Sequence, residues 1–121
     1  MSDQISQSLI LAKQFFGKEV EVFVDRQLGT KHPKHDYFYE VNYGYLPGVM
    51  APDGEELDAY CLGLSQPQEK IIGIVGAIVH RFEDDDDKLI VFPKNINFTD
   101  EEIEKAINFQ EKWFKHEILR F

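Results

Sequence analysis

Hydrophobic residues recur along this chain at two spacings, one typical of helices and the other of strands. Helical spacing near the start is formed by four apolar residues: Ile5, Leu9, Ala12 and Phe16. Ser2 or Asp3 is expected to cap this helix, and Gly17 to end it. A second helix is expected near the C-terminus, because Thr99 and Glu102 form a capping-box pattern. Its inward face is predicted to comprise Ile103, Ala106, Ile107, Gln110 and Phe114.

Between the two helices the apolar spacing changes to that of β-strands. The predicted strands cover residues 19–25, 41–45, 57–64, 71–82 and 88–92. Turns are expected at Pro47-Gly48 and at Pro52-Asp53-Gly54, and a polar loop over residues 27–36. Short strands in series with flanking helices predict an α+β, mainly β, fold. We expect a small closed, OB-like β-barrel with an N-terminal and a C-terminal helix.

Length and charge restrict the organisation and the class of partner. The 121 residues suit one domain over 1–121, and a hydrophobic content of 43% is that of a globular protein. The net charge is -9, from 22 acidic and 13 basic residues. This balance argues against a nucleic-acid partner and against an anionic membrane surface. It is compatible with bound cations, and equally with a solvated acidic surface.

Cysteine usage and the start of the chain predict a location. Cys61 is the only cysteine, so no intramolecular disulfide forms and a reduced compartment is expected. Polar residues follow Met1, which argues against a secretory signal, and the longest apolar run, residues 71–79, is too short to span a bilayer. We therefore expect a soluble cytoplasmic protein.

A first acidic cluster lies in residues 53–58. Gly54 lets the backbone turn sharply, so Asp53, Glu55 and Asp58 could converge on one point. Oxygen ligands of this kind suit a hard divalent cation such as Mg²⁺. Asp58 lies within an apolar strand, where an unpaired carboxylate is costly to bury. The other interpretation, a solvated acidic turn before a strand, stays open.

A second acidic cluster, residues 83–87, ends in Lys88. It lies between two apolar strands and is expected to be a hairpin at the barrel rim. Such a run is often only a solvated tip. Lys88 is also placed to donate to a phosphate oxygen.

Tyrosines and cations complete the candidate chemistry. Strand alternation places Tyr39, Tyr43 and Tyr45 on one face, either as barrel filling or as donors to a phosphate. Arg26 offers a bidentate donor, and Lys34 lies in the polar loop. A zinc site at the two histidines of that loop is disfavoured, because no cysteine or glutamate completes a ligand set.

Three segments of this chain resemble segments of family I soluble inorganic pyrophosphatases, and they follow one another in the same order as in that family. Residues 53–59 fit the family signature D-[SGDN]-D-[PE]-[LIVMF]-D-[LIVMGAC] at every position but the third. Residues 39–45, YEVNYGY, resemble its Y-P-x-N-Y-G-Y segment, and the acidic run ending in Lys88-Leu89 resembles a shortened D-x4-D-x-K-L. The resemblance implies a small β-barrel that hydrolyses inorganic pyrophosphate with several Mg²⁺ ions, Mn²⁺ being a possible substitute. It also implies a homo-oligomer.

The resemblance also implies roles for individual residues. The implied metal ligands are Asp53, Asp58, Asp86 and one or both of Glu83 and Asp84. The implied substrate-binding residues are Arg26, Lys34, Tyr39, Tyr43, Lys88 and Lys115. Lys34 belongs to an alternative register in which Asp25 replaces Arg26 in the site and binds metal. Glu55 is the implied base for the attacking water, which places it with Asp53 and Asp58 in the catalytic set.

The chain departs from the family pattern at two of these positions and in its length. Glu55 stands where the family has aspartate, and Phe114 stands where a tyrosine would precede Lys115. The chain is also shorter than typical members. These departures leave two alternatives open beside pyrophosphate hydrolysis. One is a non-catalytic module that binds metal and phosphate, and the other is a hydrolase or binder of nucleotides or polyphosphate, with residues 31–35 extending the anion pocket.

Overall fold

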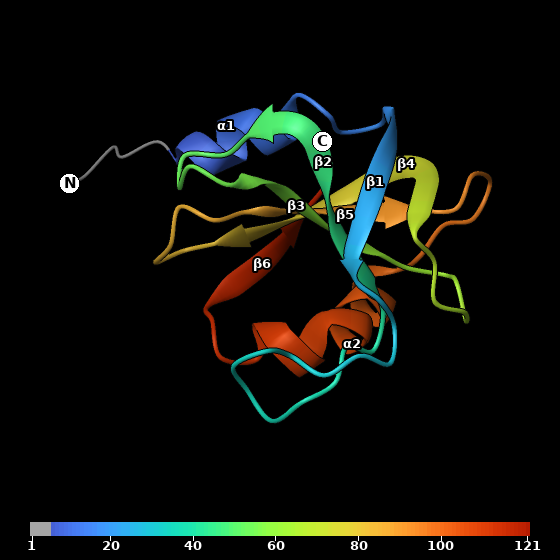
Figure 1. Ribbon diagram of the computed structural model, residues 1–121. Coiled ribbons are helices and arrows are strands. Elements are labelled where there is room, and N and C mark those ends of the chain that lie inside the picture. The colour runs from blue at the N-terminus through green and yellow to red at the C-terminus, as the bar shows by residue number, and fades with distance from the viewer. Residues whose placement is uncertain (1–5) are drawn as a thin grey trace.

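Six strands and two helices form the part of the chain that the structure, a computed structural model, describes, namely residues 6–121 (Figure 1). In chain order they are α1 (Gln7–Lys13), β1 (Glu19–Arg26), β2 (Asn42–Met50), β3 (Glu56–Cys61), β4 (Lys70–Arg81), β5 (Lys88–Phe92), α2 (Asp100–Glu111) and β6 (His116–Leu119). Neither helix is long and apolar enough to cross a membrane.

The strands form one sheet that closes on itself. Its order is β1-β2-β3-β5-β4-β6, and an additional pairing of β1 with β4 closes a five-stranded barrel. β3 and β5 are parallel, whereas the other pairs are antiparallel. The long strand β4 pairs with β1 over residues 70–74 and with β6 over residues 78–81. The predicted barrel with two helices is therefore confirmed.

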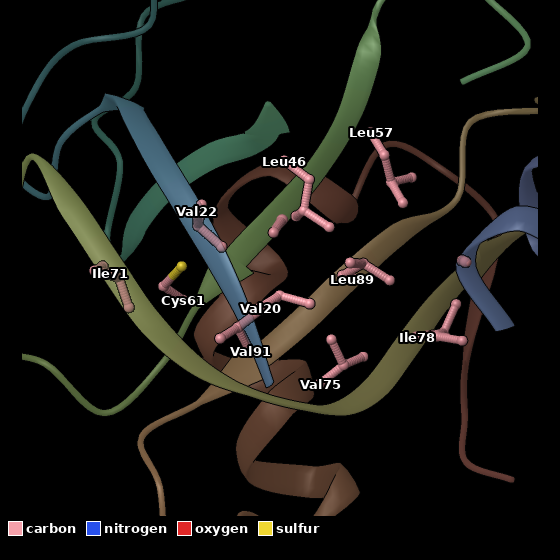
Figure 2. Close-up of a cluster of buried hydrophobic side chains, with 12 residues drawn as sticks. Val20, Val22, Leu46, Leu57, Cys61, Ile71, Val75, Ile78, Leu89 and Val91 are labelled. Carbon is pink, nitrogen blue, oxygen red and sulfur yellow. The ribbon is translucent and has the colours of Figure 1, made fainter. Parts of the chain in front are cut away.

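Alternation along the strands divides the core into two parts. In β3, Leu57, Ala59 and Cys61 point into the barrel, where they meet β1, β4 and β5 (Figure 2). The intervening Tyr60 points to the outer face, which α2 covers with Ile103 and other apolar residues. The side chain of Asp58 lies on the same outer face as Tyr60, so the alternation of β3 places a carboxylate beside the α2 layer.

The start of α2 agrees with the sequence pattern, and its end does not. Glu102 N–H donates to Thr99 Oγ1 at 3.1 Å, and Thr99 N–H donates to Glu102 Oε1 at 2.8 Å, which confirms the capping box. The helix ends at Glu111, with Lys112 as its C-cap, so Phe114 lies beyond it. The chain then forms β6, which sequence reasoning missed because four residues at the end of a chain carry too little alternation to identify a strand.

Two further local predictions were wrong. Pro47-Gly48 does not reverse the chain: β2 continues to Met50, and its pairing with β3 is irregular after Tyr45. Gly48 adopts a positive φ of 78° there, so the strand bends instead of turning back. α1 ends at Lys13 with Gln14 as its C-cap, before the predicted stop at Gly17. Its N-cap is Ser6, and the predicted capping residues Ser2 and Asp3, together with Ile5, lie outside the described residues.

One glycine allows β1 and β2 to approach closely. A Cβ on Gly44 would collide with the Phe23 carbonyl of β1. Gly44 follows Tyr43 and pairs with Val24 on one side and Ala59 on the other. The absence of a side chain therefore lets β2 lie tightly between β1 and β3, which fixes the place of Tyr43 on the outer face.

Candidate functional site

A cleft of about 790 Å³ lies beside the barrel, between the loop over residues 32–39 and the end of α2. It brings together seven of the predicted site residues: Arg26, Lys34, Tyr39, Tyr43, Asp58, Asp86 and Lys88. They come from β1, the loop, β2, β3, the β4–β5 hairpin and β5. Residues far apart in the sequence thus converge because four neighbouring strands present their outer faces to the same space.

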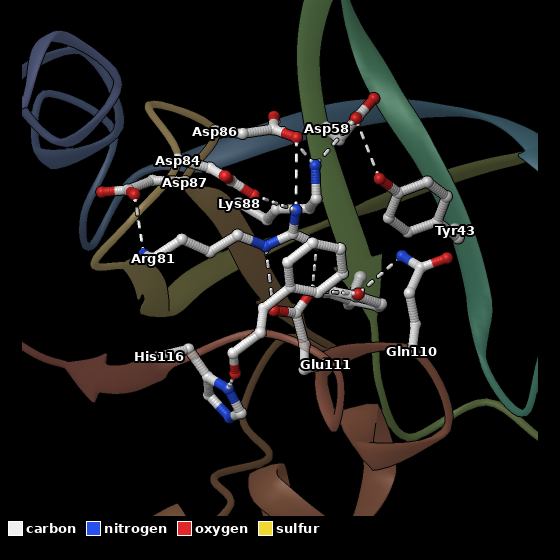
Figure 3. A network of polar contacts seen from close by, with 12 residues as sticks. Tyr43, Asp58, Arg81, Asp84, Asp86, Asp87, Lys88, Gln110, Glu111 and His116 are labelled. Atoms are coloured by element: carbon white, nitrogen blue, oxygen red, sulfur yellow. Dashed lines mark hydrogen bonds and ion pairs between the residues drawn. The ribbon is translucent and has the colours of Figure 1, made fainter.

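Lys88 lies between Asp86 and Asp58 of this set (Figure 3). Only 3% of the residue is exposed, and its Nζ donates to Asp86 Oδ1 at 3.0 Å and to Asp58 Oδ2 at 3.2 Å. The Tyr43 hydroxyl donates to the same Asp58 oxygen at 2.8 Å. Burial, followed by the charge of Asp58, raises the pKa of Tyr43 well above its ordinary value. Tyr43 therefore stays a neutral hydrogen-bond donor at physiological pH.

Beside Lys88 lies an ion pair that sequence reasoning missed (Figure 3). Arg81 Nε donates to Glu111 Oε1 at 3.0 Å and its Nη2 donates to Glu111 Oε2 at 2.6 Å. The Tyr60 hydroxyl donates to Glu111 Oε2 at 2.6 Å, and Gln110 Nε2 donates to that hydroxyl at 2.7 Å. One signal was present: Glu111 follows Ile103 and Ile107 at four-residue spacing, which places it on the buried face of α2.

The acidic run over residues 83–87 divides into different environments. Asp85 Oδ1 accepts Ser8 N–H at 2.7 Å and the Ser6 hydroxyl at 2.9 Å at the start of α1. Asp87 is 1% exposed, and its carboxylate accepts Arg81 N–H at 3.0 Å. Only Asp86 of this run lines the cleft.

Five predicted site residues lie outside the cleft lining: Asp53, Glu55, Glu83, Asp84 and Lys115. Asp53 and Glu55 form an exposed turn in which Asp53 Oδ1 accepts Glu55 N–H at 2.9 Å. This turn lies toward α1, whereas α2 and the loop of the cleft lie at the other end of the barrel (Figure 1). Asp84 lies 3.5 Å from Arg81 Nη1, and Glu83 is exposed. Lys115 is exposed, and its backbone carbonyl accepts Phe82 N–H at 3.0 Å.

Among the described residues, two carboxylates are placed to bind a metal ion together. Residues 6–121 contain no group of three or more His, Cys, Asp or Glu side chains arranged to hold a metal ion. Asp58 and Asp86 do converge, and both contact Lys88. Mg²⁺ is commonly bound by one or two carboxylates together with water and substrate phosphates. The pair therefore fits an ion that arrives with a phosphate ligand, and it does not form a cage for several ions.

The cleft is close to electrically balanced. Its cationic lining residues are Arg26, Lys34, Arg81 and Lys88, and its carboxylates are Asp25, Asp36, Asp58 and Asp86. Burial raises the pKa of Asp25, against a smaller opposing effect of Arg26. Burial also raises the pKa of Tyr39 to about 12. The cleft thus combines four cations, three neutral phenols (Tyr37, Tyr39 and Tyr43) and four carboxylates, of which Asp25 has a raised pKa.

Aromatic side chains from the loop over residues 32–39 and from the segment after α2 form part of the cleft wall. Tyr37 lies in the middle, stacked on Trp113 with 5.2 Å between ring centroids. His32 and His35 pack on each other at 4.7 Å and on Tyr37 at 5.0 and 5.9 Å. Both histidines therefore serve in this aromatic packing, and no described third ligand joins them.

Comparison with known proteins gives one family and one fold. The family model described as "Inorganic pyrophosphatase" matches residues 13–121. No curated protein gives a significant match. The crystal structure of inorganic pyrophosphatase from Ehrlichia chaffeensis is 15% identical, with a TM-score of 0.68 over 87% of this chain and 87% of that chain. The enzyme from Coxiella burnetii is 14% identical, with a TM-score of 0.63 over 85% and 84%. The enzyme from Helicobacter pylori is 15% identical, with a TM-score of 0.62 over 84% and 82%.

Proposed function

This chain belongs to the inorganic pyrophosphatase family, and we propose that it hydrolyses pyrophosphate bound with Mg²⁺ in the cleft around Lys88. The observation that carries the proposal is the convergence of Asp58, Asp86 and Tyr43 on or beside Lys88. Carboxylates, a phenol and an ammonium group within one cleft can bind a metal-bound phosphate.

The charge balance of the cleft supports the need for a metal ion. Four cations face four carboxylates, so the cleft by itself offers little attraction for a highly charged anion. The residues that would hold the ion are Asp58 and Asp86. When bound, Mg²⁺ would neutralise phosphate charge and make a bound water more acidic. Mn²⁺ has the same preference for oxygen ligands and is the expected substitute.

The remaining cleft residues have separate tasks toward the substrate. Lys88, Arg26 and Lys34 neutralise the phosphate oxygens, and Arg26 offers the planar, two-pronged donor that suits a phosphate. Tyr39 and Tyr43 donate hydrogen bonds without adding charge, since burial keeps both phenols protonated. Together they hold the anhydride in place and stabilise charge on the departing phosphate.

Asp25 is the cleft residue best suited to accept a proton from the attacking water. Its carboxylate takes part in none of the ion pairs among the described residues, and burial raises its pKa. Asp58 is less available to accept a proton, because Tyr43 and Lys88 already donate to its Oδ2. Glu55, the base that the family resemblance implies, lies on the exposed turn outside the cleft.

Phosphate release from pyrophosphate tests the proposal directly. We expect release with Mg²⁺, none with a chelator, and a loss of at least about 100-fold in Asp58→Asn, since even indirect metal contacts contribute 10–100-fold. Asp100→Asn, at the start of α2 and outside the cleft lining, is the matched control. Equal rates in the two variants would contradict the assignment of the cleft.

A second variant separates the cleft from the acidic turn. If Asp53 binds metal, as the family motif implies, Asp53→Asn should lose activity as Asp58→Asn does. If the cleft residues suffice, the exposed position of Asp53 predicts a much smaller effect. The ratio of the two rates therefore decides whether the turn belongs to the site.

Assembly and location remain predictions. The homo-oligomer implied by the family resemblance is tested by light scattering after size-exclusion chromatography. A cytoplasmic location is tested by cell fractionation.

A further inference from the structure

We propose that Arg81 is a substrate-binding residue of the cleft, a fixed cation that binds a phosphoryl group directly. No part of the sequence pattern assigned it a role, yet it lines the cleft at the end of β4. The inference rests on the proposed function, because a phosphate ligand must enter the cleft for Arg81 to bind it. It extends that function by naming a permanent charge that contributes to substrate neutralisation beside the metal ion.

The guanidinium is held firmly from behind. Nε and Nη2 both donate to Glu111, which is fully buried and is itself held by the Tyr60 hydroxyl. The ring of Phe114 covers one face of the guanidinium, with 3.8 Å from Cζ to the ring centroid. A group held by a two-pronged ion pair and an aromatic face has little orientational freedom to lose when a ligand binds.

One nitrogen of Arg81 makes only long contacts. Nη1 lies 3.4 Å from Asp86 and 3.5 Å from Asp84, both at the outer limit of a hydrogen bond. Asp86 has a closer partner in Lys88 Nζ at 3.0 Å. Nη1 is therefore the nitrogen that a phosphoryl oxygen can satisfy better than the present carboxylates do.

A purely structural role explains only part of this arrangement. An arginine that only ties α2 to the sheet needs the contact with Glu111 and gains nothing from a third nitrogen facing a cleft. Arg120 shows such a role within the same chain, since its Nε donates to Asp100 Oδ1 at the start of α2, and it does not line the cleft. The described residues contain no group of three or more side chains that could hold a metal ion. A fixed guanidinium can therefore supply positive charge to the substrate that additional metal ions would otherwise provide.

The test compares two conservative substitutions, Arg81→Lys and Arg120→Lys. Each keeps its positive charge, so Glu111 keeps a counter-ion and the fold is expected to persist. Binding of imidodiphosphate, a pyrophosphate analogue that resists hydrolysis, is measured by calorimetry with Mg²⁺ present. Pyrophosphate turnover is measured in parallel to obtain kcat and KM.

We expect Arg81→Lys to weaken imidodiphosphate binding by about tenfold or more, because the single nitrogen of a lysine cannot occupy both the position of Nε and Nη2 beside Glu111 and the position of Nη1 toward the cleft. KM for pyrophosphate should rise with it, whereas Arg120→Lys should change neither value by more than about twofold. If Arg81→Lys lowers the melting temperature but leaves imidodiphosphate affinity within about twofold of the wild type, Arg81 is structural and the inference is wrong.

Failure of the inference can be separated from failure of the proposed function. If the wild type binds imidodiphosphate but releases no phosphate from pyrophosphate, hydrolysis is refuted, while the affinity ratio still decides the role of Arg81. If the wild type does not bind imidodiphosphate at all, both proposals are wrong.

Discussion

Replacement of Glu111 by glutamine tests the energetic weight of the buried ion pair. Glu111 is fully buried, and Arg81 is only 5% exposed, so Glu111→Gln leaves a guanidinium largely without its counter-charge. Removing one partner of a buried ion pair costs about 3–5 kcal/mol. Glutamine keeps one acceptor oxygen, and Asp86 remains 3.4 Å from Nη1, so we expect the lower end, about 3 kcal/mol. For a chain of this size the melting temperature should fall by roughly 10 °C.

The assay is urea unfolding monitored by circular dichroism, and Glu104→Gln is the control variant. Glu104 lies on the same helix, but its side chain is 45% exposed, and its contact with His116 should contribute at most about 1 kcal/mol. A double variant, Arg81→Met with Glu111→Leu, should recover most of the loss, since an apolar pair of similar size replaces both charges. If Glu111→Gln costs no more than Glu104→Gln, the pair does not stabilise the fold as argued.

At acidic pH, the difference in the free energy of unfolding between the wild type and Glu111→Gln should become smaller. Burial by itself raises the pKa of Glu111, but the hydrogen bonds and charge of Arg81 outweigh burial and hold the pKa below its ordinary value. A depressed pKa in the folded state contributes stability above the unfolded-state pKa of about 4.3. That contribution disappears as the pH falls through the folded-state pKa. A difference that is constant from neutral pH to strong acid would refute this linkage.

Two further predictions concern other parts of the fold. Gly44→Ala should destabilise the barrel by about 1–3 kcal/mol or more in urea unfolding, because the new Cβ collides with the Phe23 carbonyl; an unchanged midpoint would show that β1 and β2 separate at no cost. His116 should stabilise the protein at acidic pH: burial lowers its pKa, but hydrogen bonds to Glu104 and to the Phe114 carbonyl outweigh burial and raise it. This contribution is complete below the unfolded-state pKa of about 6.5 and is lost as the pH rises through the folded-state value, so His116→Gln should flatten the stability profile there.

Much of the fold follows from local pattern, and the exceptions have identifiable causes. Alternation predicts β1 and β4 because one side of each strand is apolar over most of its length. The extension of β2 past Pro47 depends on pairing with β3, and its bend at Gly48 resembles a turn in sequence alone. β6 exists because the second half of β4 has a free edge, a fact that no local pattern carries.

The sequence predicts the residues of the candidate site only where strand alternation decides to which face of the sheet a side chain points. Asp58 and Lys88 each lie in a strand, so their neighbours in the barrel fix which face they point to. Arg81 and Glu111 are 30 residues apart, and their meeting depends on how α2 lies across the sheet. The turn with Asp53 and Glu55 follows the family motif in sequence, but its place in space depends on the length and bend of β2.

The acidic run shows why a charge cluster in sequence is a poor guide to a charge cluster in space. Its five carboxylates would repel one another if they shared one environment. In the fold, Asp85 binds the start of α1, Asp87 lies beside His80 at 2.8 Å, and Asp86 faces Lys88. Each of these three carboxylates therefore meets a donor from a different element, and the repulsion is replaced by three separate attractions. For function, this hairpin therefore offers the cleft only one carboxylate for binding a metal ion, Asp86. The positive charge that bound metal ions do not supply to a phosphate ligand must then come from side chains such as Lys88 and Arg81.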